Sequence, residues 1–328
     1  MSTIDRTRSP SLPVPATPAR PEARAEAARP EARAEARSLS VGGLVNAVTD
    51  GIKDIPRFVK MGTDVFEASH LRELSRIFGG DAKPDRMSDG AFIGAKGESF
   101  KPGTPLNQIP GVTPLKNPNP SETILYVNGI MTPAEGQLHE MTAIAERSGA
   151  KVVGIHNATQ GLVTDLVQCV TDKLDKGTNP AVDTLADTVY SELKAGKDVH
   201  LMGYSQGGLI TARALFDVQQ RLRIEDGMSA ADTEKLMGKL KVETFGAAST
   251  KYPDGPQYVH YVNNADTVPT LTGLGGSVDP LAFLKDAGKG AVVHRFTDGN
   301  INFISNHMLD TMYMKHRVPF DQARTNQF

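Results

Sequence analysis

The sequence contains one cysteine, no tryptophan and no long hydrophobic run among its 328 residues. With Cys169 alone, the chain can form neither an internal disulfide nor a zinc or iron–sulfur site from its own cysteines. No ligand spacing typical of a metal site is present, so we expect no cofactor. No apolar run approaches the roughly 18 residues of a membrane span, and no secretory signal is recognisable. A cytoplasmic location is the default expectation, and export by a non-classical bacterial route is the alternative.

An excess of either charge is also absent. The chain has 36 Lys and Arg against 38 Asp and Glu, a formal net charge of -2, and no long run of basic residues. Proteins that bind nucleic acid present a basic surface, so this composition excludes nucleic acid as the main partner. The oligomeric state stays open.

Residues 19–37 lack valine, isoleucine, leucine and aromatic side chains altogether. They read ARPEARAEA twice in tandem, followed by one more arginine. Such a segment buries too little apolar surface to offset the entropy lost on ordering it. We therefore expect residues 1–40 to form a disordered tail rich in Ala, Arg, Glu and Pro.

Residues 41–118 are expected to form a second region. Apolar residues recur at three-to-four spacing between Val41 and Phe78, which predicts two amphipathic helices interrupted at Pro56. These helices are expected to cap the core, with a lid or a transient contact with a membrane surface as alternatives. Residues 81–120 are rich in Gly, Pro and Asn, which predicts an extended linker.

Residues 119–328 show the alternation of an α/β domain. Short β-branched runs predict strands at residues 123–127, 152–155, 199–203, 241–245, 258–262 and 291–296. Amphipathic segments predict helices at residues 133–148, at residues 161–193 with a break near Asn179 and Pro180, and at residues 206–223. The expected fold class is α/β, with a mostly parallel sheet and crossover helices.

The strongest chemical signal is the segment Gly203-Tyr204-Ser205-Gln206-Gly207, because it joins a predicted strand to a predicted helix. This G-x-S-x-G pattern is typical of the nucleophile elbow, a tight turn that presents a serine hydroxyl. The two glycines relieve crowding there, and the helix start lets the backbone N–H of Gln206 face a developing oxyanion. Ser205 is therefore the candidate nucleophile.

A serine nucleophile needs a histidine base and a carboxylate that orients it, and after a nucleophile elbow they follow in the order Ser, Asp or Glu, His. His307 follows the last predicted strand by a loop that can reach back over the sheet edge. Asp266 stands in the loop after the strand at residues 258–262. The weaker candidates are His260 and His294, expected within the sheet or core, His316, expected on the surface, and Asp254, Asp279 and Asp298, expected to form turns.

These motifs resemble the fungal-type, or class 3, lipases of the α/β-hydrolase superfamily. The resemblance covers residues 199–316, about a third of the chain, and lies in GYSQGG, in TFG ending at Gly246, in DTVP beginning at Asp266, and in Asn-His ending at His307, with Tyr313 downstream. It implies an α/β-hydrolase fold with Ser205 as nucleophile, Asp266 as acid and His307 as base. Chain order selects the same three residues.

The chain departs from the family pattern at Tyr204 and Asn306, where His and Asp are usual. It also has Asn128 where many α/β-hydrolases have His, in the turn after the first central strand. In these enzymes the loop after that strand supplies the second oxyanion donor. The resemblance therefore implies that a backbone N–H of Gly129, Ile130 or Met131 acts beside that of Gln206.

The sequence predicts a serine hydrolase that cleaves carboxylic esters through an acyl-enzyme intermediate, with an ester or lipid as its substrate. Lipase, phospholipase and short-chain esterase remain open, and a thioesterase is an alternative on the same fold. Apolar residues between Leu271 and Leu284 are expected to form a packed surface helix, or else a lid over an acyl-chain entrance. A non-catalytic interaction protein on a hydrolase scaffold is the second alternative.

Overall fold

The computed structural model describes residues 88–130, 132–158, 179–275, 285–299 and 303–328. The expected tail, the two amphipathic helices and the first part of the helix expected from residue 161 lie outside these residues. So do Met131, Cys169, Asp279 and the apolar residues at 276–284. The division of the chain into three regions stays a prediction.

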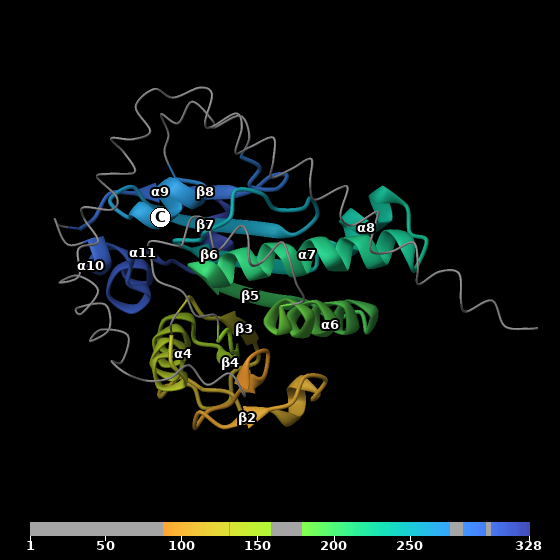
Figure 1. Cartoon of the computed structure of the whole chain (residues 1–328), viewed down its shortest axis with the longest axis horizontal. Helices are drawn as coiled ribbons and strands as arrows, with labels where there is room; N and C mark the ends of the chain where they lie inside the picture. The colour runs from red at the N-terminus through yellow and green to blue at the C-terminus, as the bar shows by residue number, and fades with distance from the viewer. Residues whose placement is uncertain (1–87, 131, 159–178, 276–284, 300–302) are drawn as a thin grey trace, which may run out of the picture. The chain divides into compact units, whose positions relative to one another are not determined.

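The core is one eight-stranded sheet with the strand order β2-β1-β4-β3-β5-β6-β7-β8 (Figure 1). The strands are β1 Phe92–Ile93, β2 Ser99–Phe100, β3 Thr123–Val127, β4 Lys151–Ile155, β5 Val199–Tyr204, β6 Leu240–Phe245, β7 Gln257–Asn263 and β8 Val292–Phe296. All neighbouring strands from β4 to β8 pair in parallel, whereas β1 pairs antiparallel with both β2 and β4. The predicted α/β fold with a mostly parallel sheet is confirmed.

Two of the helices that connect and cover these strands match the segments predicted at residues 133–148 and 206–223, and a third matches the later part of the segment predicted at residues 161–193. The described helices are α4 Ala134–Ser148, α6 Pro180–Lys194, α7 Gln206–Ile224, α8 Ala230–Met237, α9 Thr267–Thr272, α10 Phe303–His307, α11 Met314–His316 and α12 Phe320–Arg324. A short 3-10 turn, η2, spans Leu106–Gln108, and a π-helical turn, η5, spans Leu309–Tyr313. Within the described ranges, none combines the length and apolar character needed to cross a membrane.

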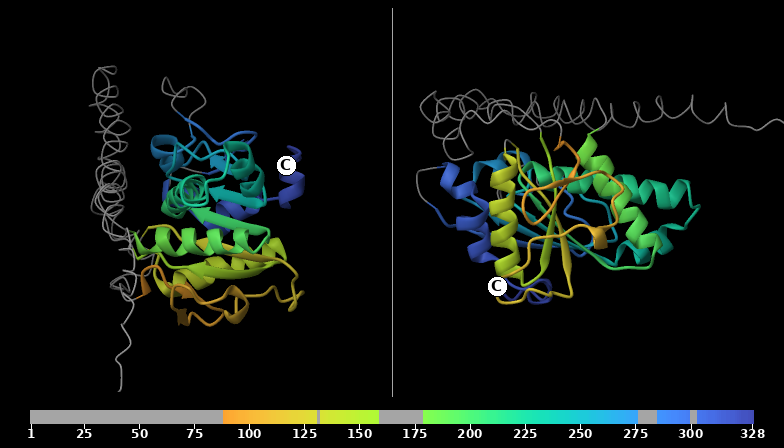
Figure 2. Two further views of the ribbon diagram at one scale, coloured as in Figure 1. Left: turned by 90° about the vertical axis from the view of Figure 1, so that its right-hand side faces the viewer. Right: turned by 90° about the horizontal axis from the view of Figure 1, so that it is seen from below.

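Each face of the sheet has its own hydrophobic core, because successive side chains of a strand point to opposite faces. On one face, Leu201 and Val242 pack with apolar residues of α6, α7 and α8. On the other face, Met202 and Phe245 pack with apolar residues of α4, η5 and α12. Figures 1 and 2 show α6 and α7 side by side, with α4 on the opposite side of the sheet.

The start of α6 lies where the sequence predicts a break. The side chain of Asn179 accepts a hydrogen bond from the backbone N–H of Val182 at 3.1 Å, and Pro180 occupies the first helical turn. An N-cap Asn satisfies one of the unpaired donors of a helix start, and a proline at this position loses no helical hydrogen bond. The two residues together therefore begin the helix.

The segment expected to be a linker contributes two strands to the sheet, which corrects that expectation. Phe92 and Ile93 are fully buried, and Phe92 pairs with Ile155 at the end of β4. A strand of two residues is too short to show alternation in the sequence, and the Gly and Pro residues around it favour an irregular chain. This segment forms a strand because it pairs with β4 in the folded protein.

Candidate active site

The parallel strands β3, β5, β6 and β7 all end at the same edge of the sheet. Asn128 and Gly129 follow β3, Ser205 follows β5, Gly246 follows β6, and Asp266 comes three residues after β7. In open α/β sheets, ligands bind outside the carboxyl ends of the strands. The candidate residues predicted from the sequence thus gather at the edge where such folds place their sites.

Ser205 occupies a sharp turn between β5 and α7. Its backbone has φ 55° and ψ −122°, a region that L-residues rarely adopt, and its N–H donates to the carbonyl oxygen of Phe245 at 2.9 Å. The flanking glycines explain how this conformation fits. A Cβ at Gly203 would lie 2.7 Å from Oγ1 of Thr211, and one at Gly207 would overlap the carbonyl oxygen of Val127. Backbone strain of this kind is typical of functional residues.

Asp266 and His307 form a direct pair. Nδ1 of His307 lies 2.6 Å from Oδ2 of Asp266, and the Asp266 carboxylate is fully buried. The other carboxylate oxygen, Oδ1, accepts from the backbone N–H of Val268 at 2.9 Å, where Asp266 caps α9. Because the carboxylate accepts at Nδ1, that nitrogen carries the hydrogen, which leaves Nε2 of His307 with its lone pair.

Tyr313 completes the surroundings of the Asp266 carboxylate. Its hydroxyl donates to Oδ2 of Asp266 at 2.5 Å, and burial together with the negative charge of Asp266 raises the pKa of Tyr313 well above its usual value. Gly246 passes close to both groups with φ 53°. A Cβ there would lie 2.8 Å from the Tyr313 hydroxyl and 3.0 Å from Oδ2 of Asp266. A glycine is therefore required after β6.

Tyr204 brings His307 beside the turn that holds Ser205. The Tyr204 hydroxyl donates to the carbonyl oxygen of His307 at 2.6 Å, and the two rings lie 5.0 Å apart between centroids. Tyr204 immediately precedes Ser205 in the chain. The departure from the lipase pattern at this position thus provides a contact between the serine turn and the histidine.

Two asparagines join the acid loop to the histidine helix. The amide of Asn306 donates to the carbonyl oxygen of Ala265 at 3.0 Å. The amide of Asn263 donates to the carbonyl oxygens of Asp298 at 2.7 Å and Asn306 at 3.2 Å, while its oxygen accepts from the N–H of Ala265 at 3.1 Å. The asparagine that replaces the usual Asp before the histidine therefore fixes the separation of His307 and Asp266.

The implied oxyanion residues also lie at this edge, apart from Met131, which is outside the described residues. A Cβ built on Gly129 would lie 3.1 Å from Cβ of Ser205, so the loop after β3 passes close to the serine. Gln206 is the first residue of α7, where backbone N–H groups have no partner inside the helix. Neither Ile130 nor Gln206 donates its backbone N–H to a described residue.

The weaker histidine candidates all have structural partners. His260 is buried, it bonds Oγ1 of Thr244 and the carbonyl oxygen of Ala287, and burial lowers its pKa to about 4. His294 lies on β8 as expected, and its ring stacks on Phe328 at 3.7 Å. His316 is more buried than the sequence predicts. It stacks on Phe296 at 3.9 Å and bonds the carboxylate of Asp298 at 2.8 Å.

The two remaining acids that the structure describes also have structural partners. Oδ1 of Asp254 accepts from the backbone N–H of Lys289 at 2.8 Å. Asp298 accepts from Nζ of Lys315 and from His316, and these bonds lower the pKa of Asp298. The hydrogen bond to His307 thus distinguishes Asp266 from both of them.

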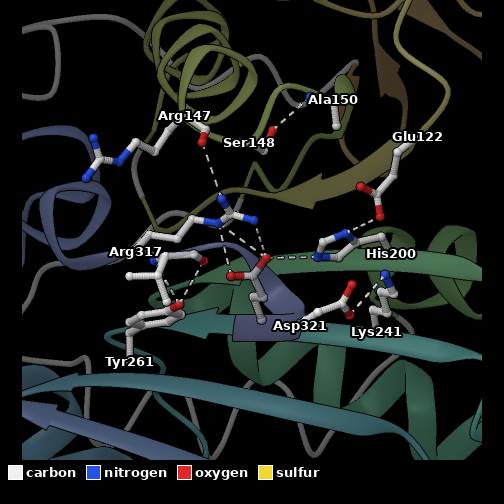
Figure 3. A network of polar contacts seen from close by, with 11 residues as sticks. Glu122, Arg147, Ser148, Ala150, His200, Lys241, Tyr261, Arg317 and Asp321 are labelled. Atoms are coloured by element: carbon white, nitrogen blue, oxygen red, sulfur yellow. Dashed lines mark hydrogen bonds and ion pairs between the residues drawn. The ribbon is translucent and has the colours of Figure 1, made fainter. Parts of the chain in front are cut away.

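A separate polar cluster ties the C-terminal segment to the sheet (Figure 3). Glu243 on β6 is fully buried and accepts from the guanidinium of Arg317 at 2.8 Å and 3.0 Å. His200 on β5 bonds Glu243 at 2.9 Å and Glu122 at 2.8 Å. Burial lowers the pKa of His200, but the bonds to the two carboxylates outweigh it, so the pKa stands above its usual value. This cluster is a structural clamp that anchors the chain just beyond His307.

Sequence reasoning missed the positions that support the candidate residues. The sequence gives Tyr313 a place downstream of His307 but no role, and it gives Asn263 none. The signal that could have found Asn263 is its place directly before the acid loop, in the run NNAD. Among the residues that the structure describes, no group of three or more His, Cys, Asp or Glu side chains is placed to hold a metal ion.

Comparisons with known proteins assign the chain to no family. No family model matches the sequence, and no curated protein matches it. Among solved structures, the chain is similar to a protein from Xanthomonas campestris pv. campestris that is provisionally assigned as a hydrolase of the alpha/beta superfamily. The two are 16% identical, the match covers 63% of this chain and 93% of that one, and the TM-score is 0.26. A likeness of this size carries no argument about activity.

Proposed function

We propose that this protein is a serine hydrolase that cleaves carboxylic esters, with Ser205 as nucleophile, His307 as general base and Asp266 as the orienting acid. One observation carries the proposal. The hydrogen-bonded pair of His307 and Asp266 stands beside a strained serine turn, at the carboxyl edge of a parallel sheet. A serine nucleophile, a histidine base and an orienting carboxylate are the groups that acyl transfer requires, and this pairing beside the serine turn supports the proposal.

The mechanism follows from the proposed roles. Nε2 of His307 takes the proton of the Ser205 hydroxyl as its oxygen attacks the ester carbonyl carbon. The carbonyl oxygen becomes an oxyanion, which accepts hydrogen bonds from the backbone N–H of Gln206 and of Ile130 or Gly129. His307 then gives the proton to the leaving alcohol, and an acyl-enzyme remains on Ser205. A water molecule, activated by His307, hydrolyses it and releases the acid.

The test of this proposal is covalent labelling by a fluorophosphonate probe. The wild-type protein is expected to be labelled and to hydrolyse a nitrophenyl ester. Ser205→Ala is expected to lose labelling, and His307→Ala and Asp266→Asn to lose about 10³-fold or more in kcat. The matched control is Ser191→Ala, which removes an exposed hydroxyl from α6 and leaves labelling unchanged. Equal labelling of the wild-type protein and Ser205→Ala would show that Ser205 is not the nucleophile.

The finer proposal is that the ester carries an acyl chain, which makes the protein a lipase, phospholipase or esterase. It is supported by the resemblance of residues 199–316 to class 3 lipases. The test is a series of nitrophenyl esters of increasing acyl length, followed by phospholipid vesicles and an acyl thioester. A kcat/KM that is highest for the thioester would replace the ester assignment. No turnover of any substrate by a folded, unlabelled protein would favour the non-catalytic scaffold.

A further inference from the structure

Two buried asparagines connect three segments at the carboxyl edge of the sheet. Asn128 follows β3, Asn157 follows β4, and neither side chain is exposed. The amide of Asn157 donates to Oε1 of Gln206 at 2.6 Å, and its backbone N–H donates to Oδ1 of Asn128 at 2.8 Å. The network therefore runs from the loop after β3, through the loop after β4, to the first residue of α7.

Asn128 orients the peptide that follows Gly129. Its amide donates to the carbonyl oxygen of Gly129 at 2.9 Å and to that of Asn157 at 3.0 Å. In a trans peptide the C=O and the next N–H point in opposite directions. Because the Gly129 carbonyl points toward Asn128, the N–H of Ile130 points away from it. No described residue accepts a hydrogen bond from this N–H.

Asn157 acts on the other side of the proposed oxyanion hole. Its amide fixes the side chain of Gln206, the residue whose backbone N–H is the first proposed donor. The loop that carries Asn157 is itself held by the antiparallel edge. Its neighbour His156 exchanges backbone hydrogen bonds with Gly90 and Ala91, and the N–H of Ala158 donates to the carboxylate of Asp89 at 3.0 Å. The residues directly before the strand β1, which the sequence did not predict, thus support this loop.

We propose that Asn128 and Asn157 are positioning residues that hold the two donors of the oxyanion hole at a fixed separation. This inference rests on the proposed function of Ser205. Donors stabilise an oxyanion strongly only when they are fixed before the reaction, at about 2.7–3.1 Å from the oxygen. Buried amides with satisfied hydrogen bonds on both sides provide that rigidity. Both act at a distance from the proposed reacting atoms: Asn157 through the side chain of Gln206 and Asn128 through the carbonyl of Gly129 in the loop after β3.

The test is a double-mutant cycle on the hydrogen bond between Asn157 and Gln206, measured as ester hydrolysis. Asn157→Ala removes the donor, and Gln206→Met removes the acceptor but keeps the backbone N–H. Each single variant is expected to lower kcat about tenfold to hundredfold with little change in KM, because small misplacements of catalytic groups cost this much. The double variant is expected to lose no more than either single variant, because both act through one bond.

A second readout separates positioning from general damage to the fold. A trifluoromethyl ketone forms a tetrahedral oxyanion on a serine nucleophile, so its inhibition constant is expected to rise in proportion to the fall in kcat/KM. Thr233→Val is the control, because it removes the hydrogen bond of a buried threonine to the carbonyl oxygen of Ser229, at 2.8 Å at the start of α8, and is expected to leave kcat unchanged. If Asn157→Ala does not fold, Gln206→Met alone carries the test.

The outcomes for this inference and for the proposed function are distinguishable. A wild-type protein that is neither labelled nor active overturns the assignment of Ser205 and the inference with it. A labelled, active wild-type protein whose Gln206→Met variant keeps kcat within twofold overturns the positioning role alone. Fully additive losses in the double variant, or a lower kcat with an unchanged inhibition constant for the ketone, also overturn it.

Discussion

The hydroxyl of Tyr313 donates a hydrogen bond to Oδ2 of Asp266 at 2.5 Å. The same oxygen accepts from Nδ1 of His307, so one buried carboxylate oxygen serves two donors. Tyr313 therefore helps to set the direction in which the carboxylate faces the imidazole. The proposed triad therefore depends on a fourth side chain.

Tyr313→Phe is expected to lower kcat/KM for a nitrophenyl ester about tenfold to hundredfold. The reason is that a hydrogen bond to a charged group contributes about 1.5–3 kcal/mol, and about 1.4 kcal/mol corresponds to a factor of ten. The control is Tyr190→Phe, which removes a comparable bond from a tyrosine hydroxyl to Asp226, at 2.9 Å on α6. A Tyr313→Phe variant as active as Tyr190→Phe would contradict the role of Tyr313.

Gly207→Ala is expected to destabilise the fold by more than Gly149→Ala. A Cβ at Gly207 would overlap the backbone oxygen of Val127, whereas a Cβ at Gly149 meets nothing within 4 Å and suffers only from its φ of 76°. An alanine held in the left-handed conformation of Gly149 costs about 1–2 kcal/mol of stability. The measurement is thermal unfolding of both variants. A Gly207→Ala protein that melts at or above the temperature of Gly149→Ala would rule out the close approach at the elbow.

Arg317→Met is expected to reduce the free energy of unfolding by about 3–5 kcal/mol, because it removes the guanidinium that pairs with the buried Glu243 carboxylate. Arg221→Met is the control, since Arg221 pairs with Asp187 and Asp217 near the surface, where such pairs contribute about 1 kcal/mol or less. Urea unfolding measures the free energy of unfolding of both variants. Adding Glu243→Gln to Arg317→Met is expected to recover part of the loss. Equal costs for the two arginine variants would contradict this prediction.

Glu140→Gln is expected to flatten the dependence of stability on pH. Burial raises the pKa of Glu140 from 4.5 to about 8, the hydrogen bond from the Tyr126 hydroxyl opposes this, and the charge of Asp310 adds to it. The folded protein thus binds the proton of Glu140 more tightly than the unfolded chain does. The stability that this proton binding adds is fully present below about pH 4.5 and is lost as the pH rises toward 8.

Urea unfolding at several pH values between 4 and 9 measures the effect of Glu140. The difference in unfolding free energy between the wild-type protein and Glu140→Gln is expected to fall across that window. Glu135→Gln, an exposed glutamate change on the same helix, serves as the control. A wild-type minus Glu140→Gln difference that does not vary with pH would refute the raised pKa.

Much of the sheet could be predicted because its central strands are long enough to show their character in the sequence. The six runs expected between residues 123 and 296 coincide with β3 to β8. Several described elements were not predicted, and two of them, β1 and α9, show the physical reason. The strand at Phe92–Ile93 exists only through its pairing with β4, and the helix after Asp266 depends on that residue capping it. Neither interaction leaves a periodic pattern in the sequence.

Some residues of the candidate site could also be predicted from the sequence, and others could not. Ser205, Asp266 and His307 could be named from local motifs and their order, and the structure places the last two in contact. The side chains that support them act over long separations in the chain. Tyr313 bonds a residue 47 positions earlier, and Asn157 bonds one 49 positions later. Such pairs arise only when the sheet brings its strand ends together, which no local pattern predicts.

The clamp between Glu243 and Arg317 has a consequence for how the protein is made. The two residues are 74 positions apart, and translation at about 5–20 residues per second separates their synthesis by about 4–15 seconds. During that interval a central strand of the nascent sheet carries the Glu243 carboxylate without its guanidinium partner. We therefore expect this face of the sheet to close late, so that the segment carrying His307 takes its final position only after Arg317 has been made.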